Sequence, residues 1–132
     1  MPDAVLYLDS SAILKLVVPE PETGAVRELP RSWPEPVSSV IATIEVERAA
    51  RRVGGGAIRR ARTILSGIGL VELDDAVVRA AATLEPTKLR TMDAIHLASA
   101  VSLRRDLGAL CTYDRRLGEA AALRTIQVLS PA

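Results

Sequence analysis

Hydrophobic and polar positions divide the chain into short apolar runs separated by longer amphipathic segments. The apolar runs are rich in strand formers, which is typical of strands buried on both faces. The segments between them carry apolar residues at helical spacing. The predicted strands are residues 4–8, a short segment near Val37, and residues 70–73, 109–113 and 125–129. The predicted helices are residues 12–18, 23–29, 40–53, 57–66, 75–84, 92–105 and 115–123.

Residues that favour helix ends stand between these segments. Candidate N-caps are Ser10 or Ser11, Ser38 or Ser39, Asp74 and Thr91. Prolines follow the first two predicted helices, and three consecutive glycines at 54–56 end the helix that covers residues 40–53. Strands that alternate with helices in this way predict an α/β fold of three α/β/α layers with a central, mostly parallel sheet. The 132 residues fit one domain, residues 1–132, without a linker or a repeat.

Composition excludes several classes of protein. No apolar stretch approaches the ~20 residues that span a bilayer, and the chain starts directly with a strand rather than with a basic segment and a cleavage site. We therefore expect a soluble, cytoplasmic protein without a membrane partner. A single cysteine, Cys111, lies in a predicted buried strand and is expected to be an inert core thiol. A single histidine, His96, excludes mechanisms that need two imidazoles.

Charge is unevenly distributed along the chain, although the net charge is only +1. One stretch from Arg48 to Arg62 has six arginines and no acidic residue. Two interpretations are open. The arginines either form solvated helix faces in a chain rich in alanine, glycine and proline, or they form a surface that binds RNA phosphates. With no phenylalanine and one tryptophan, Trp33, base stacking would contribute little to such binding.

Four carboxylate side chains are the candidate catalytic groups. Asp9 and Asp114 each follow the carboxyl end of a predicted strand, where ligands collect in parallel sheets. Asp93 lies in the first turn of its helix, which by itself is also a favourable place for a structural aspartate. Glu45 falls on the edge of an apolar helix stripe, whereas Glu47 points away and can pair with Arg51 at i+4.

Convergence of these acids would raise their pKa values and destabilise the fold unless a cation joins them. Mg²⁺ prefers oxygen ligands and keeps several waters, so one or two direct carboxylates suffice. Such a site can activate water for attack on a phosphodiester. Zinc is disfavoured because the sequence has no cluster of cysteine and histidine.

At these positions the sequence resembles a known family. The segments LDSSAI (residues 8–13), TMDAIHLA (91–98) and TYDRRL (112–117), with Glu45 between the first two, are similar to PIN-domain ribonucleases of the VapC toxin type. The resemblance extends over essentially the whole chain. It implies a PIN-like fold, a Mg²⁺- or Mn²⁺-dependent endoribonuclease, a homodimer, and a VapB-like antitoxin that covers the site.

The resemblance also implies roles for individual residues. Asp9 and Asp93 correspond to direct metal ligands, and Glu45 and Asp114 complete the site. Ser11 and Thr112 match positions that hold supporting hydroxyls. His96 is open to three interpretations, as a general base, as a hydrogen-bond partner of the site, or as a packing residue. Tyr7 and Tyr113 are expected to be strand core residues.

Two other classes compete with a nuclease. A phosphatase or phosphotransferase on a doubly wound sheet would also place Asp9 after the first strand, but enzymes of the haloacid-dehalogenase type carry a second aspartate where this chain has Ser11. A non-catalytic, receiver-like module would use an acidic pocket only for binding. Receivers pair their acids with a lysine after a late strand, whereas arginines follow Asp114. Metal-dependent RNA cleavage separates these alternatives.

Overall fold

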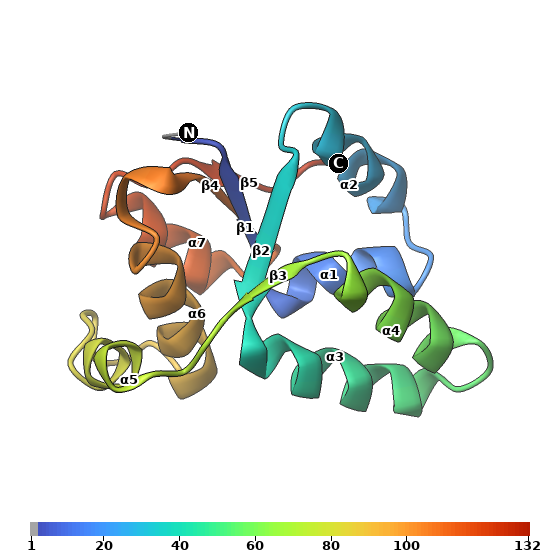
Figure 1. The fold of residues 1–132 in the computed structure, drawn as a ribbon, viewed down its shortest axis with the longest axis horizontal. Helices are drawn as coiled ribbons and strands as arrows, with labels where there is room; N and C mark the ends of the chain where they lie inside the picture. The colour runs from blue at the N-terminus through green and yellow to red at the C-terminus, as the bar shows by residue number, and fades with distance from the viewer. Residues whose placement is uncertain (1–2) are drawn as a thin grey trace.

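The computed structural model describes residues 3–132 and contains one five-stranded parallel sheet in the order β3-β2-β1-β4-β5 (Figure 1). The strands are β1 (Val5–Leu8), β2 (Glu35–Ser39), β3 (Gly69–Val71), β4 (Leu107–Cys111) and β5 (Val128–Leu129). The first strand of the chain therefore lies in the middle of the sheet. Because all pairs are parallel, the carboxyl ends of the strands meet at one edge.

Helices cover both faces of the sheet, which confirms the predicted three-layer α/β/α architecture (Figure 1). The helices are α1 (Ser10–Val17), α2 (Thr23–Glu28), α3 (Val40–Val53), α4 (Ala57–Ser66), α5 (Asp75–Ala82), α6 (Thr91–Val101) and α7 (Arg115–Ala122), with 3₁₀ turns η1 (Leu29–Arg31) and η2 (Arg104–Asp106). Helices α1 to α4 lie on one side, and α5 to α7 on the other. Among residues 3–132, none of these helices has the length and apolar character to cross a bilayer.

Alternate residues of the central strand supply the two halves of the core. Leu6 and Leu8 of β1 pack with helices α1 to α4, and Tyr7 packs with α6 and α7. All four β1 residues are buried, because helices cover both faces of this strand. This is why the strand has a continuous apolar sequence rather than an alternating one.

The structure corrects two of the predicted caps. Asp9, not Ser10 or Ser11, caps α1, because the helix already begins at Ser10. At α6 the N-cap position is Arg90, which forms no side-chain capping bond, and Thr91 is the first residue inside the helix. The predicted caps Ser39 and Asp74 are confirmed, with hydrogen bonds from the N–H groups of Ile41 at 3.2 Å and Val77 at 2.9 Å.

Helix ends follow backbone conformation. Helix α3 stops at the glycines, because Gly54 and Gly55 have φ values of 79° and 59°, which residues with a Cβ rarely adopt. Helix α6 ends at Val101 rather than at the predicted residue 105. Beyond its end, Arg104 has a φ of 54°, and this left-handed residue turns the chain into β4.

Candidate active site

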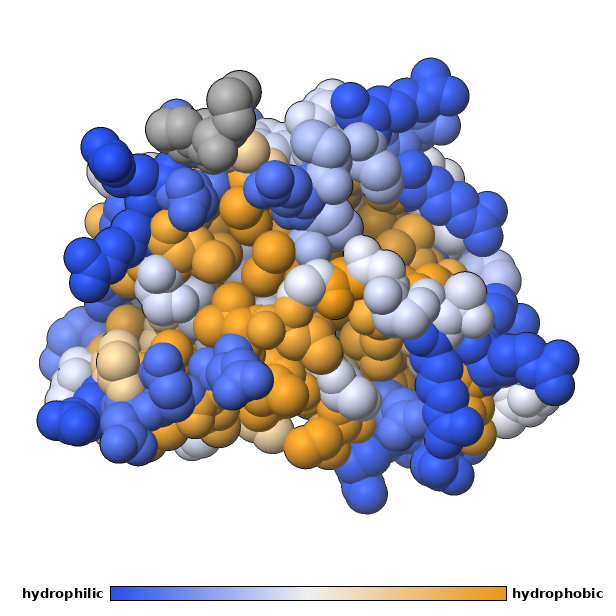
Figure 2. All heavy atoms as spheres, in the orientation of Figure 1, coloured by the Kyte–Doolittle hydropathy of each residue, from blue (hydrophilic) through white to orange (hydrophobic). Residues whose placement is uncertain are grey.

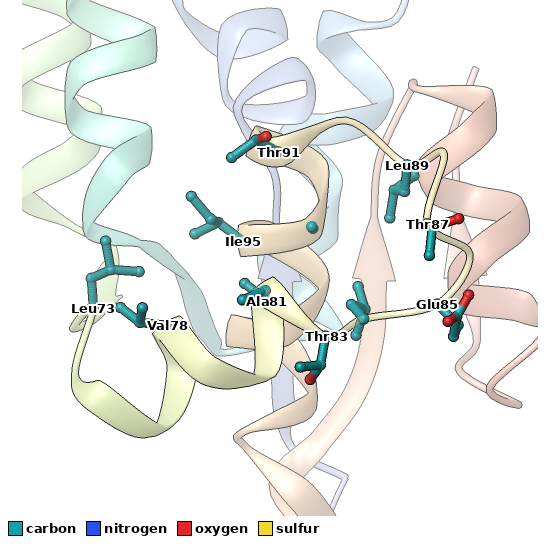
Figure 3. A pocket seen from close by; sticks show the side chains of 12 residues that line it. Leu73, Val78, Ala81, Thr83, Glu85, Thr87, Leu89, Thr91 and Ile95 are labelled. Atoms are coloured by element: carbon teal, nitrogen blue, oxygen red, sulfur yellow. The ribbon is translucent and has the colours of Figure 1, made fainter.

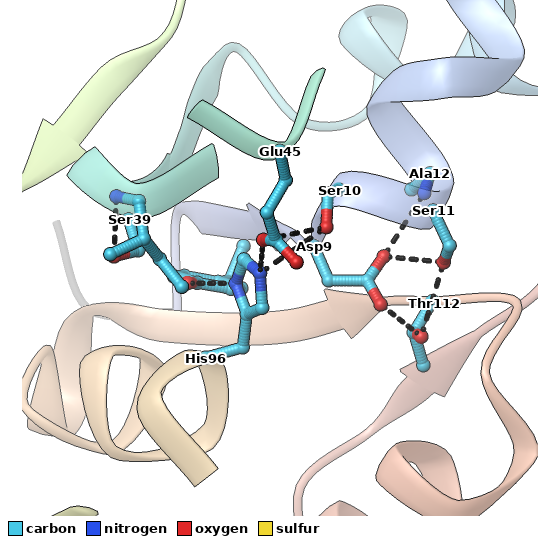
Figure 4. A network of polar contacts seen from close by, with 10 residues as sticks. Asp9, Ser10, Ser11, Ala12, Ser39, Glu45, His96 and Thr112 are labelled. Atoms are coloured by element: carbon cyan, nitrogen blue, oxygen red, sulfur yellow. Dashed lines mark hydrogen bonds and ion pairs between the residues drawn. The ribbon is translucent and has the colours of Figure 1, made fainter. Parts of the chain in front are cut away.

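Asp9 stands at the carboxyl end of β1, beside the end of β4. Its Oδ1 accepts hydrogen bonds from the Ser11 hydroxyl at 2.6 Å and the Ala12 N–H at 3.0 Å (Figure 4). Its Oδ2 accepts a hydrogen bond from the Thr112 hydroxyl at 2.5 Å. The residue is 3% exposed, and this burial raises the pKa of Asp9 while the three hydrogen bonds oppose the shift. Asp9 is therefore a buried carboxyl group with a fixed orientation.

Asp114 is tied to Asp9 through one threonine. It caps α7, since its Oδ1 accepts from the Leu117 N–H at 3.0 Å. Its own N–H donates to Thr112 Oγ1 at 2.9 Å, and the hydroxyls of Ser11 and Thr112 are 3.4 Å apart. The structure thus brings both candidate supporting hydroxyls to Asp9, and their role in chemistry stays a prediction.

Asp93 differs from these two capping residues. It lies in the first turn of α6 and is half-buried, and no hydrogen bond from the described residues contributes to its pKa. Burial is the largest cause that raises the pKa of Asp93. The other three candidate carboxylates raise it further, while the imidazole of His96 opposes them. Asp93 therefore lies within electrostatic range of the other three acids, although the four come from four separate segments.

Glu45 reaches the site from the middle of α3 and has a partner that sequence analysis did not identify. Its Oε1 accepts from the Ser10 hydroxyl at 2.8 Å and lies 2.7 Å from Nε2 of His96 (Figure 4). Burial alone would raise the pKa of Glu45, but the contacts with His96 and Ser10 outweigh it and lower the pKa. Glu45 is therefore ionised at neutral pH. No local signal in the sequence indicates this contact, because the two residues are 51 positions apart.

His96 is 1% exposed, and both of its ring nitrogens have partners. Nε2 faces Glu45, and Nδ1 lies 2.7 Å from the hydroxyl of Tyr7. A general base needs a free nitrogen within reach of the water that it deprotonates. Of the three interpretations left open by the sequence, the geometry favours a hydrogen-bond partner of the site.

The carboxylate oxygens of the candidate site are ligands of the type that a hard cation prefers, but they do not form a complete coordination sphere. Within residues 3–132, no group of three or more His, Cys, Asp or Glu side chains is arranged to hold a metal ion. Mg²⁺ binds through one or two carboxylates and retains waters, so it does not require such a group. Asp93 has no hydrogen-bond partner among residues 3–132, and its pKa is raised first by burial and then by the other carboxylates, so a cation beside it would relieve the most repulsion.

Comparison with known proteins identifies the family. The PIN domain family matches residues 6–123, which is most of the chain. The chain belongs to the PIN-domain family. Ribonuclease VapC46 of Mycobacterium tuberculosis is 46% identical over 129 residues, covering 98% of this chain and 99% of the relative. Ribonuclease VapC47 of the same species is 37% identical over 122 residues, covering 86% of this chain and 87% of the relative. The resemblance to VapC-type PIN domains is thereby confirmed.

A solved structure supports the fold of this PIN domain independently. The chain is similar to a toxin–antitoxin complex from Klebsiella pneumoniae with a TM-score of 0.73, covering 96% of this chain and 98% of that one. The sequences are only 23% identical, so this likeness concerns the fold alone.

A cavity of the PIN domain lies apart from the carboxylates. It has a volume of about 660 Å³ and lies between α5, the segment 83–89 and one side of α6 (Figure 3). Leu73, Val78 and Ile95 point into it. None of the four candidate carboxylates lines this cavity. Its lining also includes Glu85 and three threonines, but none of the residues that sequence analysis assigned to the site.

The arginine-rich stretch is partly engaged in structural contacts. Glu47 accepts a hydrogen bond from Nε of Arg62 at 2.7 Å, so its ion pair is with Arg62 and not with Arg51, whose charge acts on Glu47 only from a greater distance. The turn at residues 54–56 folds α4 back against α3. Arg62 of α4 therefore reaches the carboxylate of Glu47 and replaces Arg51, which lies one turn along α3, as its ion-pair partner. Arg60 donates through Nε to the carbonyl of Val17 at 2.9 Å. The exposed Arg51, Arg52 and Arg59 remain candidates for phosphate binding.

Proposed function

We propose that this PIN domain is an endoribonuclease and acts as the toxin of a toxin–antitoxin pair. The observation that carries the proposal is its similarity, over 98% of its length, to a protein named Ribonuclease VapC46. Two further observations support it: Asp9 and Asp114 follow the carboxyl ends of β1 and β4, and Asp93 lies within electrostatic range of the other three candidate carboxylates. RNA is the proposed substrate.

We further propose Mg²⁺ as the cofactor, with Mn²⁺ as a possible substitute. Asp9 and Asp93 are the candidate direct ligands, and Glu45 and Asp114 would act through water. When bound, the ion would supply positive charge that activates a water and offsets charge developing on the phosphodiester. The half-buried Asp93 is supported as a ligand because no hydrogen bond from the described part of the chain contributes to its pKa.

The chain's own residues would then have separate tasks. Asp9 holds a ligand oxygen in a fixed position, because three hydrogen-bond donors prevent rotation of its carboxylate. Glu45, whose pKa is lowered by His96 and Ser10 against the effect of burial, adds negative charge that retains a cation, and Asp114 would complete the site. Attack by water on phosphorus, with loss of the 3′ oxygen, leaves a 5′-phosphate and a 3′-hydroxyl. The ribose 2′-hydroxyl has no role in this scheme.

Cations next to the carboxylates would hold the RNA. Arg90 precedes Asp93 at the start of α6, and Arg115 follows Asp114 at the start of α7, and both arginines are exposed. Without neighbouring positive charge, four carboxylates would repel an RNA backbone. These two arginines therefore add to the candidates of the arginine-rich stretch.

We propose two protein partners. A VapB-like antitoxin is supported by the similarity to VapC proteins. A homodimer is supported by large exposed apolar side chains, namely Val40, Ile44, Leu73, Val78 and Met92. Figure 2 shows hydrophobic residues gathered over the middle of the face that carries β3 and α5. Contiguous apolar surface of this kind is uncommon on monomers, and we assign it to a second copy of the chain.

Sedimentation equilibrium tests the dimer. Ile44→Glu combined with Val78→Glu should give a folded monomer, because each substitution places a charge on the apolar face. Leu123→Glu is the matched control, since Leu123 is 80% exposed at the end of α7 and lies outside this set. A monomeric wild type, or a double variant that stays dimeric, would contradict the assignment.

RNA cleavage by the purified protein tests the enzyme. Cleavage should require Mg²⁺ or Mn²⁺, stop with EDTA, and be lost in Asp93→Asn. Induction in cells followed by sequencing of new RNA 5′ ends should show discrete cleavage sites. RNA that binds but is never cut would support a non-catalytic binding module instead, and hydrolysis only of a phosphomonoester would support a phosphatase.

A further inference from the structure

A line of polar side chains crosses from the core of the sheet to the candidate site. It begins at Tyr7, which is 0% exposed in the middle of β1. The Tyr7 hydroxyl lies 2.7 Å from Nδ1 of His96, and Nε2 of His96 lies 2.7 Å from Oε1 of Glu45 (Figure 4). The two buried rings meet edge to face, with centroids 5.8 Å apart. Three elements, β1, α6 and α3, are thus joined by two hydrogen bonds.

The direction of both hydrogen bonds follows from the chemistry of the groups. An ionised carboxylate only accepts, so Nε2 of His96 carries the proton that faces Glu45. In the neutral imidazole, Nδ1 then accepts the hydrogen bond that the Tyr7 hydroxyl donates. Each polar atom in the line therefore has a partner of the correct kind.

The line restrains one oxygen of Glu45 and leaves the other free. Oε1 receives the Ser10 hydroxyl at 2.8 Å as well as the imidazole. Among the described residues, no hydrogen bond or ion pair involves Oε2. A glutamate on a helix has several accessible rotamers, and two partners on one oxygen select among them.

We infer that Tyr7 and His96 are positioning residues, which fix the side chain of Glu45 so that Oε2 is the oxygen available to a cation or its waters. The inference rests on the proposed function, because it assigns Glu45 to that site. It extends the site inward by two residues that touch neither the RNA nor the ion. Loss of such supporting contacts typically weakens metal binding or activity about 10- to 100-fold.

Removal of single hydroxyl groups provides a sharp test. Tyr7→Phe deletes only the hydroxyl that contacts His96. This hydroxyl does not touch Glu45 and is linked to it through two successive hydrogen bonds. Tyr113→Phe is the matched control, because its hydroxyl donates to the carbonyl of Pro131 and takes no part in the line. Tyr7→Phe should lower Mn²⁺ affinity, measured by electron paramagnetic resonance, and kcat about tenfold, with KM for RNA unchanged within about twofold. Tyr113→Phe should match wild type in all three.

Conservative replacement of the histidine provides the second test. His96→Gln places an amide N–H near the position of Nε2 and should retain more Mn²⁺ affinity and kcat than His96→Leu, which cannot donate. If His96 served only for packing, leucine would be tolerated at least as well as glutamine. Equal values for the two variants at equal thermal stability would therefore overturn the inference.

A third measurement separates this inference from the proposed function. In metal-free protein, the ¹³Cδ shift of Glu45 should change in Tyr7→Phe and stay at its wild-type value in Tyr113→Phe. A wild type that neither binds Mn²⁺ nor cleaves RNA would refute the proposed function, while the Glu45 signal still reports on the hydrogen-bond line. An unchanged Glu45 signal in Tyr7→Phe would overturn the inference even in an active nuclease.

Discussion

Asp93→Asn removes one negative charge from the site with almost no change of shape. The folded environment raises the pKa of Asp93 above its usual value of 3.8, first by burial and then by neighbouring carboxylates. Between the unfolded and folded pKa values, the native state binds more protons, so stability is lost as pH rises through that window. Each unit of pKa difference corresponds to about 1.4 kcal/mol. In EDTA at neutral pH, the asparagine variant should therefore unfold at or above the temperature of wild type.

Added Mg²⁺ should reverse this order. At a free concentration of 100 Kd, a bound ion stabilises the native state by about 2.7 kcal/mol. An unfolding entropy of about 2.1 cal/mol/K per residue gives roughly 280 cal/mol/K for 132 residues, so wild type should gain roughly 10 °C. If the substitution weakens binding about a hundredfold, the same Mg²⁺ adds only about 0.4 kcal/mol, or roughly 1.5 °C.

Thermal melts in EDTA and in Mg²⁺, beside an RNA cleavage assay, check this prediction. Asp74→Asn is the control, because Asp74 caps α5 outside the site and its asparagine variant should respond to Mg²⁺ as wild type does. A variant of Asp93 that is less stable than wild type in EDTA, gains fully from Mg²⁺ and still cleaves RNA would refute the reasoning. Asp93 would then be a structural residue at a helix start.

Three further predictions concern the product, the RNA surface and the thiol. Cleavage should leave a 5′-phosphate, a 2′-deoxy substitution at the scissile nucleotide should be tolerated, and a 2′,3′-cyclic phosphate in the product analysis would contradict the water mechanism. Replacing Arg51, Arg52 and Arg59 with glutamine should weaken RNA binding and flatten its dependence on log salt by about 0.7 per lost phosphate contact, whereas an unchanged slope would indicate solvated helix faces. Burial raises the pKa of Cys111 to about 12, so a disulfide reagent should react only after unfolding, and rapid labelling of the native protein would show that the thiol is accessible.

Sequence patterns predicted the layers of the fold because strand and helix signals are local. The apolar run before Asp9 and the run before Thr112 both became central strands. Boundaries were less predictable. Thr91 has a side chain that can cap a helix, and the helix would then begin at Met92. Instead α6 already begins at Thr91. The end of α6 depends on the left-handed backbone at Arg104, which no side-chain pattern indicates.

Candidate site residues on strand ends were predictable in position, because parallel strands bring their carboxyl ends together. The contacts that hold those residues were not. The pair Tyr7 and His96 is separated by 89 positions, and Glu45 meets His96 from a third element. Such contacts depend on how α3 and α6 pack across the ends of the sheet, which the period of each helix does not specify. The pairing of Glu47 with Arg62 escaped prediction for the same reason.

The order of the strands has a consequence for the synthesis of the protein. Strand β1 is translated first but lies between β2 and β4, and Thr112, which bonds to Asp9, follows it by 103 positions. Until that late segment leaves the ribosome, β1 has one unpaired edge and Asp9 lacks both Thr112 and Asp114. A nascent chain that stops before this segment therefore carries an incomplete centre. The centre can form only after the segment that contains Thr112 and Asp114 has been synthesised and can fold against β1.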